Sequence, residues 1–203
     1  RGPVLLIDYA DNCASGGTQD TMTVVREVIA QGLDDVAVGA ICDPESVAAM
    51  INAGVGAQVT LALGGKRSMP SLGLAGEPLN VSGTVRTISD GEFVITGPMY
   101  TGVRTYMGRT ALLDTGRIQF VVTERNVEPW DVGVFTSLGI VPERKHFLLL
   151  KSRVNYRAAF KPMAKAIVEC NGIGVTTSDL SLFKYRYLKR PIYPIDNLRE
   201  RAA

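Results

Sequence analysis

The first apolar segment of the chain is a short continuous run, Val4 to Ile7, of the kind that is buried inside a parallel sheet. A polar segment that contains glycines follows it. After this segment apolar residues recur every three or four positions, which predicts a helix with one buried face that ends near Gly32. The apolar positions of this helix are Met22, Val25, Val28, Ile29 and Leu33.

A second strand and helix follow in the same order. Val36 to Ile41 is the next apolar run, and Asp43-Pro44 then supplies a helix N-cap and a proline at the first helical position. This helix is expected to stop by Gly54, and a third apolar segment, Val59 to Leu63, follows. The repeated strand-helix-strand order predicts a parallel sheet with right-handed crossovers.

The periodicity changes after residue 64. Residues 64–76 are rich in Gly, Ser and Pro, and apolar and polar residues then alternate from Leu79 to Ile95, as in half-buried strands. Asp114-Thr115-Gly116 links two apolar runs as a hairpin turn would. We therefore expect an antiparallel β region inserted at about residues 77–126.

The C-terminal third alternates again between helical and strand patterns. A short helix is expected at Val132 to Leu138 and a buried strand at Phe147 to Leu150. A helical pattern runs from Tyr156 to Glu169 but contains Pro162, which predicts a kink or a break. The last strand is expected at Gly172 to Thr176.

Together these elements predict an α/β fold with a mainly parallel sheet, flanking helices and an inserted antiparallel β region. The α/β parts are expected at about residues 1–65 and 130–180. A locally basic tail at about residues 184–203 interleaves tyrosines with bases. We expect an extended arm that packs on the body with its charges solvated, and RNA binding is the alternative.

The composition is that of a globular protein. The 203 residues are 46% hydrophobic and 21% charged, and the formal net charge of +2 indicates neither a nucleic-acid footprint nor a basic membrane patch. No apolar run approaches the about 20 residues of a membrane span, and Arg1-Gly2-Pro3 does not resemble a signal peptide. With three scattered cysteines, the expected location is the cytoplasm. The absence of an initiator Met before the first strand predicts the middle of a longer chain.

The most informative polar segment runs from Asp8 to Thr21 and connects a predicted strand to a predicted helix. Such a loop lies at the carboxyl edge of the sheet, where open α/β proteins bind ligands, and the glycines Gly16 and Gly17 let backbone N–H groups face an anion. The structural alternative is that Asp11 and Asn12 form turns and the glycines permit the bend. No Walker or dinucleotide-binding glycine pattern is present to decide between the two.

Other polar residues carry weaker signals. Gly64-Gly65-Lys66-Arg67 follows a predicted strand and could offer cations to an anion, although a solvated turn is commoner. Ser152 follows another predicted strand and is expected to be a helix cap or a hydrogen-bond donor to substrate. Cys13 is either a thiol activated beside a helix N-terminus or a buried, inert one. With His146 as the one histidine and no Cys-x-x-Cys, a catalytic metal site formed by this chain alone is not expected.

With these residues in view, the sequence resembles the C-terminal domain of the microcystinase C (MlrC) family of metallopeptidases. The resemblance spans nearly the whole chain. It depends on several short segments that occur in the same order as in the family, rather than on one motif. The matching segments are Asp8-x-x-Asp11-Asn12 with the glycines and Asp20-Thr21 that follow, Asp43-Pro44-Glu45, Ala53-Gly54-Val55-Gly56, Gly64-Gly65-Lys66, Leu138-Gly139-Ile140, Lys151-Ser152 and Arg190-Pro191-Ile192-Tyr193-Pro194-Ile195-Asp196. Two positions depart from the family: Cys13 stands where proline is usual, and Asn155 where histidine is usual.

The resemblance implies a two-domain, metal-dependent peptidase or amidohydrolase. By this implication residues 1–203 are its C-terminal domain, and an N-terminal domain of the same polypeptide supplies the ligands of a catalytic zinc. This chain alone is then expected to be inactive and to hold no metal. It would complete the fold and shape a cleft for a peptide or amide substrate through Asp11, Asn12, Gly16, Gly17 and Ser152.

Two further hypotheses stay open at this point. The chain could be a self-contained α/β module that binds a small anionic ligand at residues 11–20 without catalysis, or a scaffold domain whose loops only pack against a partner. We expect no nucleic-acid or membrane partner, and the sequence does not determine the oligomeric state.

Overall fold

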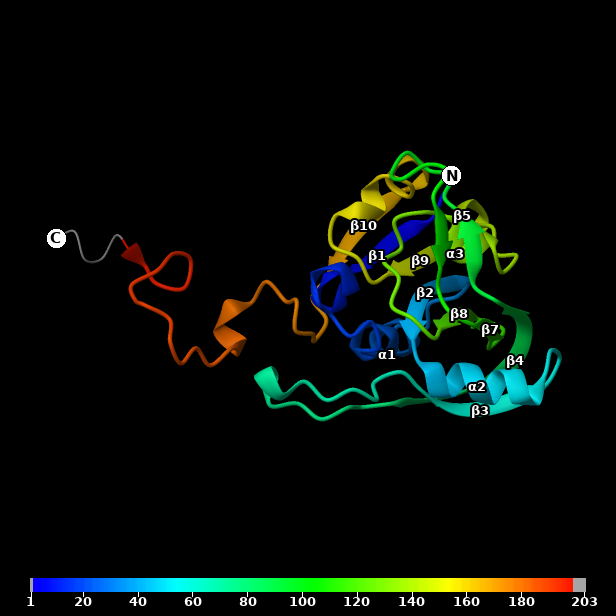
Figure 1. Cartoon of the computed structure of the whole chain (residues 1–203), viewed down its shortest axis with the longest axis horizontal. Coiled ribbons are helices and arrows are strands. Elements are labelled where there is room, and N and C mark those ends of the chain that lie inside the picture. The colour runs from blue at the N-terminus through cyan, green and yellow to red at the C-terminus, as the bar shows by residue number, and fades with distance from the viewer. Residues whose placement is uncertain (1, 199–203) are drawn as a thin grey trace.

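The structure is a computed structural model that describes residues 2–198, and its centre is one eight-stranded mixed sheet (Figure 1). The strand order is β10-β1-β9-β2-β8-β7-β4-β3. The strands are β1 (Val4–Asp8), β2 (Val36–Cys42), β3 (Gln58–Leu63), β4 (Leu79–Ser89), β7 (Thr110–Asp114), β8 (Ile118–Thr123), β9 (Phe147–Leu150) and β10 (Ala166–Cys170). A separate two-stranded sheet contains β5 (Glu92–Val94) and β6 (Arg104–Tyr106).

The helices are short and few. The α-helices are α1 (Thr23–Ala30), α2 (Pro44–Ala53) and α3 (Gly133–Thr136). Single 3₁₀ turns are η1 (Tyr9–Asp11), η2 (Cys13–Ser15), η3 (Pro70–Leu72), η4 (Pro142–Arg144), η5 (Asn155–Arg157), η6 (Lys161–Met163) and η7 (Leu180–Leu182). No helix within residues 2–198 has the length and apolar character needed to cross a bilayer.

The large sheet has a parallel part and an antiparallel part. The strands β10, β1, β9, β2 and β8 pair parallel in that order. The pairs β8–β7, β7–β4 and β4–β3 are antiparallel. The expected fold class, an α/β protein with a mainly parallel sheet and an antiparallel β region, is confirmed.

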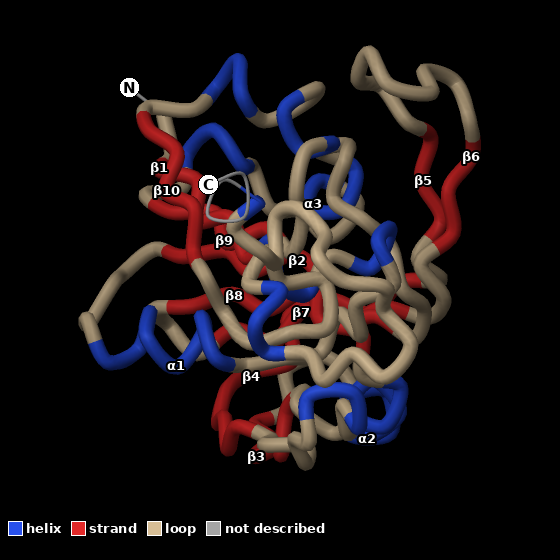
Figure 2. The backbone as a smooth tube through the Cα atoms, turned by 90° about the vertical axis from the view of Figure 1, so that its left-hand side faces the viewer, coloured by secondary structure: helices blue, strands red, loops and turns tan. Residues whose placement is uncertain are grey.

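The sheet buries a different apolar cluster on each face. Because side chains alternate along a strand, Val36 and Val38 of β2 join one cluster with α1 and α2, while Ala37 between them joins the other with α3. The tube in Figure 2 shows α1 and α2 lying apart from α3 around the strands. On the α3 side, the rings of Phe135 and Phe160 meet edge to face at 5.9 Å.

The expected parallel pairing of the third strand is wrong. β3 lies at the sheet edge and pairs antiparallel with β4, the next strand in the chain. Its residues alternate between exposed and partly buried positions, which fits an edge strand of an antiparallel pair better than a strand buried on both faces. Residues 64–78 double back between the two strands and project from the body (Figure 1).

The expected helix at Tyr156 to Glu169 is also wrong. The segment forms the two turns η5 and η6, and then the edge strand β10. Pro162 lies inside η6, where it lacks the N–H that a continuous α-helix would use. Residues 172–176, expected as the last strand, form no strand and instead lie against the loop after β1, where Thr176 donates its backbone N–H to the Ala10 carbonyl (3.0 Å).

The C-terminal arm projects from the body instead of packing on it, contrary to expectation (Figure 1). Tyr187 is 97% exposed and Tyr193 77% exposed. Arg190 forms an ion pair with Asp196 within the arm itself. The predicted basic positions Arg199 and Arg201 lie outside the described residues.

Candidate functional site

Polar side chains collect at the carboxyl edge of the parallel strands. Because β1, β2 and β9 run in the same direction, the residues that follow them meet at one edge of the sheet. Most of these side chains are buried, which is unusual for charged groups unless they are paired. The buried polar residues gathered there are Asp8, Asp11, Asn12, Gln19, Asp20, Thr21, Asp43, Glu128, Lys151 and Ser152.

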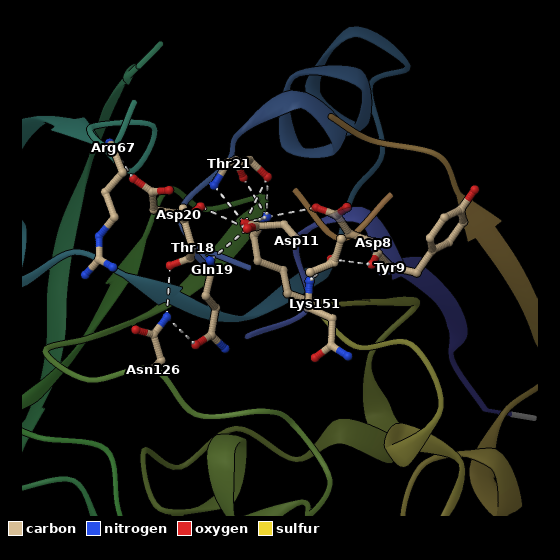
Figure 3. Close-up of polar contacts among 12 residues, drawn as sticks. Asp8, Tyr9, Asp11, Thr18, Gln19, Asp20, Thr21, Arg67, Asn126 and Lys151 are labelled. Carbon is tan, nitrogen blue, oxygen red and sulfur yellow. Dashed lines mark hydrogen bonds and ion pairs between the residues drawn. The ribbon is translucent and has the colours of Figure 1, made fainter. Parts of the chain in front are cut away.

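Lys151 is the centre of this arrangement (Figure 3). Its side chain is 0% exposed. Its Nζ donates to Asp8 Oδ2 at 2.8 Å and to Asp11 Oδ2 at 3.0 Å. It also donates to the Thr21 carbonyl at 2.6 Å and contacts the Thr21 hydroxyl at 3.0 Å. The lysine therefore ties the ends of β1 and β9 to the start of α1.

The protonation states of this network are strongly coupled. Burial opposes ionisation of Asp11, but Lys151 and the backbone N–H groups of Thr21 and Gln19 outweigh it, so the pKa of Asp11 lies below its usual value. Burial raises the pKa of Asp8, which Lys151 offsets only in part. Burial alone would lower the pKa of Lys151, but the two carboxylates raise it, so the lysine is a cation.

Asp11 organises the loop that follows it. One carboxylate oxygen, Oδ1, accepts from the Thr18 hydroxyl (2.9 Å) and the Gln19 N–H (2.8 Å). The other, Oδ2, accepts from the Thr21 N–H and hydroxyl, both at 2.9 Å. The Gln19 side chain continues the network by accepting from the Val127 N–H at 2.8 Å. Asp11 is 0% exposed, so its carboxylate acts on the loop rather than on solvent.

Asn12, Gly16 and Gly17 complete the turn of this loop. Asn12 Oδ1 accepts from the Ala14 N–H at 3.1 Å, and the Asn12 carbonyl accepts from the Gly17 N–H at 2.9 Å. A Cβ at Gly17 would lie 2.7 Å from the backbone of Asp11, so only glycine fits there. Gly16 adopts a φ of 97° and is exposed. The N–H groups of both glycines bond to carbonyl oxygens within the loop.

Ser152 belongs to a second buried group that sequence reasoning missed. Its Oγ donates to Glu128 Oε1 at 2.6 Å, and Asn155 Nδ2 donates to Glu128 Oε2 at 2.8 Å. Glu128 is 2% exposed although no strand or helix contains it. It stands just before Pro129 in a loop without periodicity, so the sequence carried no signal for its burial. The predicted cap or substrate contact, Ser152, is thus a donor to a buried carboxylate.

The Gly64-Gly65-Lys66-Arg67 loop lies beside the same edge. The Lys66 ammonium pairs with Asp43 at 2.8 Å and with Glu45 at 3.1 Å. Burial disfavours the Asp43 carboxylate, but Lys66, Ser46 and the Gly64 N–H outweigh it and hold the pKa of Asp43 below its usual value. The neighbouring Arg67 has no such carboxylate partner among residues 2–198.

Neither a reactive thiol nor a metal centre fits the described residues. Burial, with Glu128 and Asp11 nearby, raises the pKa of Cys13 to about 12, so the thiolate needed for nucleophilic attack is disfavoured. Within residues 2–198, no group of three or more His, Cys, Asp or Glu side chains could hold a metal ion.

Three comparisons with known proteins agree with one another. The family model described as MlrC C-terminus matches residues 6–187. Microcystinase C from Sphingomonas sp. is 27% identical over 194 residues, which cover 96% of this chain and 36% of that protein. The crystal structure of a "Putative metallopeptidase" from Mesorhizobium sp. BNC1 superposes with a TM-score of 0.82 over 97% of this chain and 38% of its own, at 22% identity, and so supports the fold alone. The chain thus spans little more than a third of the length of these two relatives.

Proposed function

The chain belongs to the MlrC C-terminus family, and from this premise we propose that it is the C-terminal domain of a metal-dependent peptidase or amidohydrolase. In this proposal residues 1–203 form one domain, and the α/β parts at about 1–65 and 130–180 carry the inserted β region at about 77–126 and the tail at 184–203. An N-terminal domain of the same polypeptide supplies the ligands of a catalytic metal, for which zinc is the candidate. The substrate class is a peptide or another amide.

The observation that carries this proposal is that the chain belongs to this family but spans little more than a third of the length of its two matched relatives. The matched relatives extend well beyond the part that this chain covers, and one is named microcystinase while the other is named a metallopeptidase. Residues 2–198 offer no metal cluster of their own. A division of labour between two domains accounts for both facts. The free thiols of Cys13, Cys42 and Cys170 support a cytoplasmic location in this proposal.

For the substrate, we propose that the loop of residues 8–21 shapes the cleft. Asp11, Asn12 and Ser152 are buried and bonded inside the protein, so they would set the loop conformation rather than contact substrate through free side chains. The exposed tip at Ser15 and Gly16, held by Gly17, is then the part that faces a ligand. In the full-length protein, Asp11→Ala and Asn12→Ala should lower stability, and lower turnover if the loop shapes the cleft. Unchanged turnover would indicate a scaffold domain.

The experiment that tests the proposed function compares the full-length gene product with the 203-residue chain. Intact mass, bound metal and hydrolysis of a panel of amides are measured for both. We expect metal and metal-dependent hydrolysis in the full-length product alone. A start codon directly before the Arg1 codon in the gene would contradict the proposal, and so would amide hydrolysis by the isolated chain.

The alternative, a module that binds a small anion at residues 11–20, has less support. The backbone N–H groups of Ala14, Gly16 and Gly17 already bond to oxygens inside the loop, as does that of Gln19. An anion there would have to replace these bonds. Binding of inorganic phosphate to the isolated chain, lost on changes in this loop, would restore the alternative.

A further inference from the structure

A cavity of about 230 Å³ lies at the carboxyl ends of β1 and β9. Tyr9 follows β1, Arg153 follows β9 and Glu169 belongs to β10, and all three residues line this cavity. The Tyr9 ring points away from Lys151, so the cavity lies beside the buried Lys151 network and not within it (Figure 3). Its volume is below the range for drug-sized ligands, so it suits a small one.

The place of this cavity in the sheet favours ligand binding. The strands β1 and β9 are adjacent and parallel. The chain leaves β1 through α1 to β2, which lies beyond β9, whereas it leaves β9 through η5 and η6 to β10, which lies beyond β1. The two connections therefore diverge between these strands. Open α/β sheets bind ligands at the carboxyl ends of strands where the connections diverge in this way.

Arg153 is held at the wall of the cavity by two residues that also line it. Its guanidinium carbon lies 5.4 Å from the centroid of the Tyr9 ring, and its Nη2 donates to Ser178 Oγ. Its Nη1 donates to the Thr176 carbonyl at 2.9 Å. A guanidinium has more N–H donors than these two bonds use, and the Ser178 hydroxyl can donate its own hydrogen. This wall can therefore donate to a ligand.

Arg157 supplies a second guanidinium to the same cavity. Its Nη2 lies 3.8 Å from Glu169 Oε1, and Glu169 also lines the cavity. Both side chains are exposed, and an exposed ion pair contributes little stability because water screens it. The separation is also too long for a hydrogen bond. The N–H donors of Arg157 are therefore available to a stronger acceptor.

We propose that this cavity binds a phosphate group, either as the free ion or as part of a small ligand. Two guanidiniums face one carboxylate in its lining, so the local charge favours an anion. A phosphoryl group has enough terminal oxygens to accept from both guanidiniums and from the Ser178 hydroxyl. A carboxylate has only two oxygens, and a single guanidinium fork uses both. The proposal concerns binding only, so it does not depend on the function proposed above.

The test measures anion binding to the ¹⁵N-labelled 203-residue chain at constant pH and ionic strength. Inorganic phosphate, glycerol 3-phosphate and acetate are titrated separately, and affinity and position are read from chemical-shift changes. We expect saturable shifts at Tyr9, residues 153–157, Glu169 and Ser178 with both phosphates, and weaker binding of acetate. Tighter binding of glycerol 3-phosphate than of phosphate would assign the site to a phosphoryl group on a larger ligand. The reverse order would assign it to the free ion.

Three variants test the role of charge. Arg157→Met should weaken phosphate binding about fivefold, which is the upper end for an exposed charge pair. Glu169→Gln should strengthen phosphate binding, because it removes the opposing charge. Arg144→Met is the matched control: it removes an exposed arginine that precedes β9, at the opposite edge of the sheet, and should leave phosphate binding nearly unchanged. An unchanged spectrum away from the cavity shows that each variant is folded.

Several results would overturn the proposal. They are the lack of saturable shifts with either phosphate, shifts centred elsewhere, acetate binding as tight as phosphate binding, and an Arg157→Met variant that binds phosphate no more weakly than Arg144→Met. If Arg157→Met does not fold, an unchanged phosphate affinity in Glu169→Gln would contradict the role of charge instead. None of these measurements involves turnover, so they leave the metallopeptidase proposal to its own test.

Discussion

Replacing Lys151 by methionine should strongly destabilise the domain, because it removes the cation that pairs with two buried carboxylates. Methionine keeps a long apolar side chain but cannot donate to Asp8 or Asp11, whose bonds to Nζ measure 2.8 and 3.0 Å. Asp8 would then lose its ammonium donor while Oδ1, its other carboxylate oxygen, is already buried without a partner within residues 2–198.

The magnitude follows from the burial of all three groups. Removing one partner of a buried ion pair costs about 3–5 kcal/mol, because the remaining charge is left uncompensated in a poorly solvated place. A domain of ordinary stability has about 5–15 kcal/mol in total, so the loss is a large share. For a chain of this size the melting temperature should fall by about 6–20 °C. Urea denaturation followed by circular dichroism gives both the free energy and its change.

The pH dependence makes this prediction specific. In the parent, the pKa of Asp11 is lowered, so its stabilisation is present above the unfolded value of about 3.9 and is lost as pH falls through the folded pKa. In Lys151→Met, burial without the lysine should raise the pKa of Asp11 above the unfolded value and raise further the pKa of Asp8, which burial already raises in the parent. The destabilisation caused by these two buried, charged carboxylates should then vanish as they become protonated. The difference in the free energy of unfolding between parent and variant should therefore shrink from about pH 7 to about pH 4.

Two variants control the interpretation. Lys161→Met changes an exposed lysine and should alter stability by less than about 0.5 kcal/mol. Adding Asp8→Asn to Lys151→Met should recover part of the loss, since one buried charge then remains instead of two. A loss of less than about 1 kcal/mol in the free energy of unfolding of Lys151→Met at pH 7, or an equal loss at acidic pH, would show that Lys151 does not stabilise the domain by pairing with the buried carboxylates.

Three further predictions concern the same edge of the sheet. Gly17→Ala should lower the free energy of unfolding by about 1–3 kcal/mol, because the new Cβ would lie 2.7 Å from the backbone of Asp11. Gly16→Ala should lower it by about 1 kcal/mol, because Gly16 has open space around it but a φ of 97°. Thermal melts in which Gly16→Ala is the less stable variant would contradict the loop geometry. Ser152→Ala removes a donor from the buried Glu128 carboxylate and should cost about 1–3 kcal/mol in urea denaturation, and a neutral effect would show that the bond is unimportant. Asp43→Ala removes the cap of α2 and should cost about 1–2 kcal/mol at pH 7. Because the pKa of Asp43 is lowered, this last difference should diminish as pH falls below about 4, and melts at two pH values check it.

The local pattern of the sequence determined most of the elements before residue 64. A continuous apolar run became β1, a three-and-four spacing became α1, and Asp43-Pro44 opened α2, with the Asp43 carboxylate accepting from the Ser46 N–H at 3.1 Å. These features are decided by interactions between residues close in sequence, so they can be predicted from it. The turn at residues 114–116 between β7 and β8 was predictable for the same reason.

Pairing between distant strands was not decided locally. Whether β3 pairs parallel or antiparallel depends on which neighbouring strand the sheet offers. The same holds for Ala166 to Cys170, which form an edge strand rather than a helix. An apolar run of this length carries no preference strong enough to choose. Pro162 indicated that a helix would break, but not that a strand would replace its second half.

Some features of the candidate site could likewise be predicted from the sequence, whereas others could not. The sequence by itself determined that polar residues would follow buried strands at one sheet edge, placed Asp11 and Asn12 in the loop after the first of them, and indicated the family. Only the tertiary structure decided that Lys151 would form an ion pair with Asp8, which lies 143 positions away in the sequence. The same is true of the burial of Glu128 against Ser152. It also holds for Arg67, which has no carboxylate partner within residues 2–198. The physical reason is that burial and charge pairing depend on distance in space, which the folded chain sets and a sequence pattern does not.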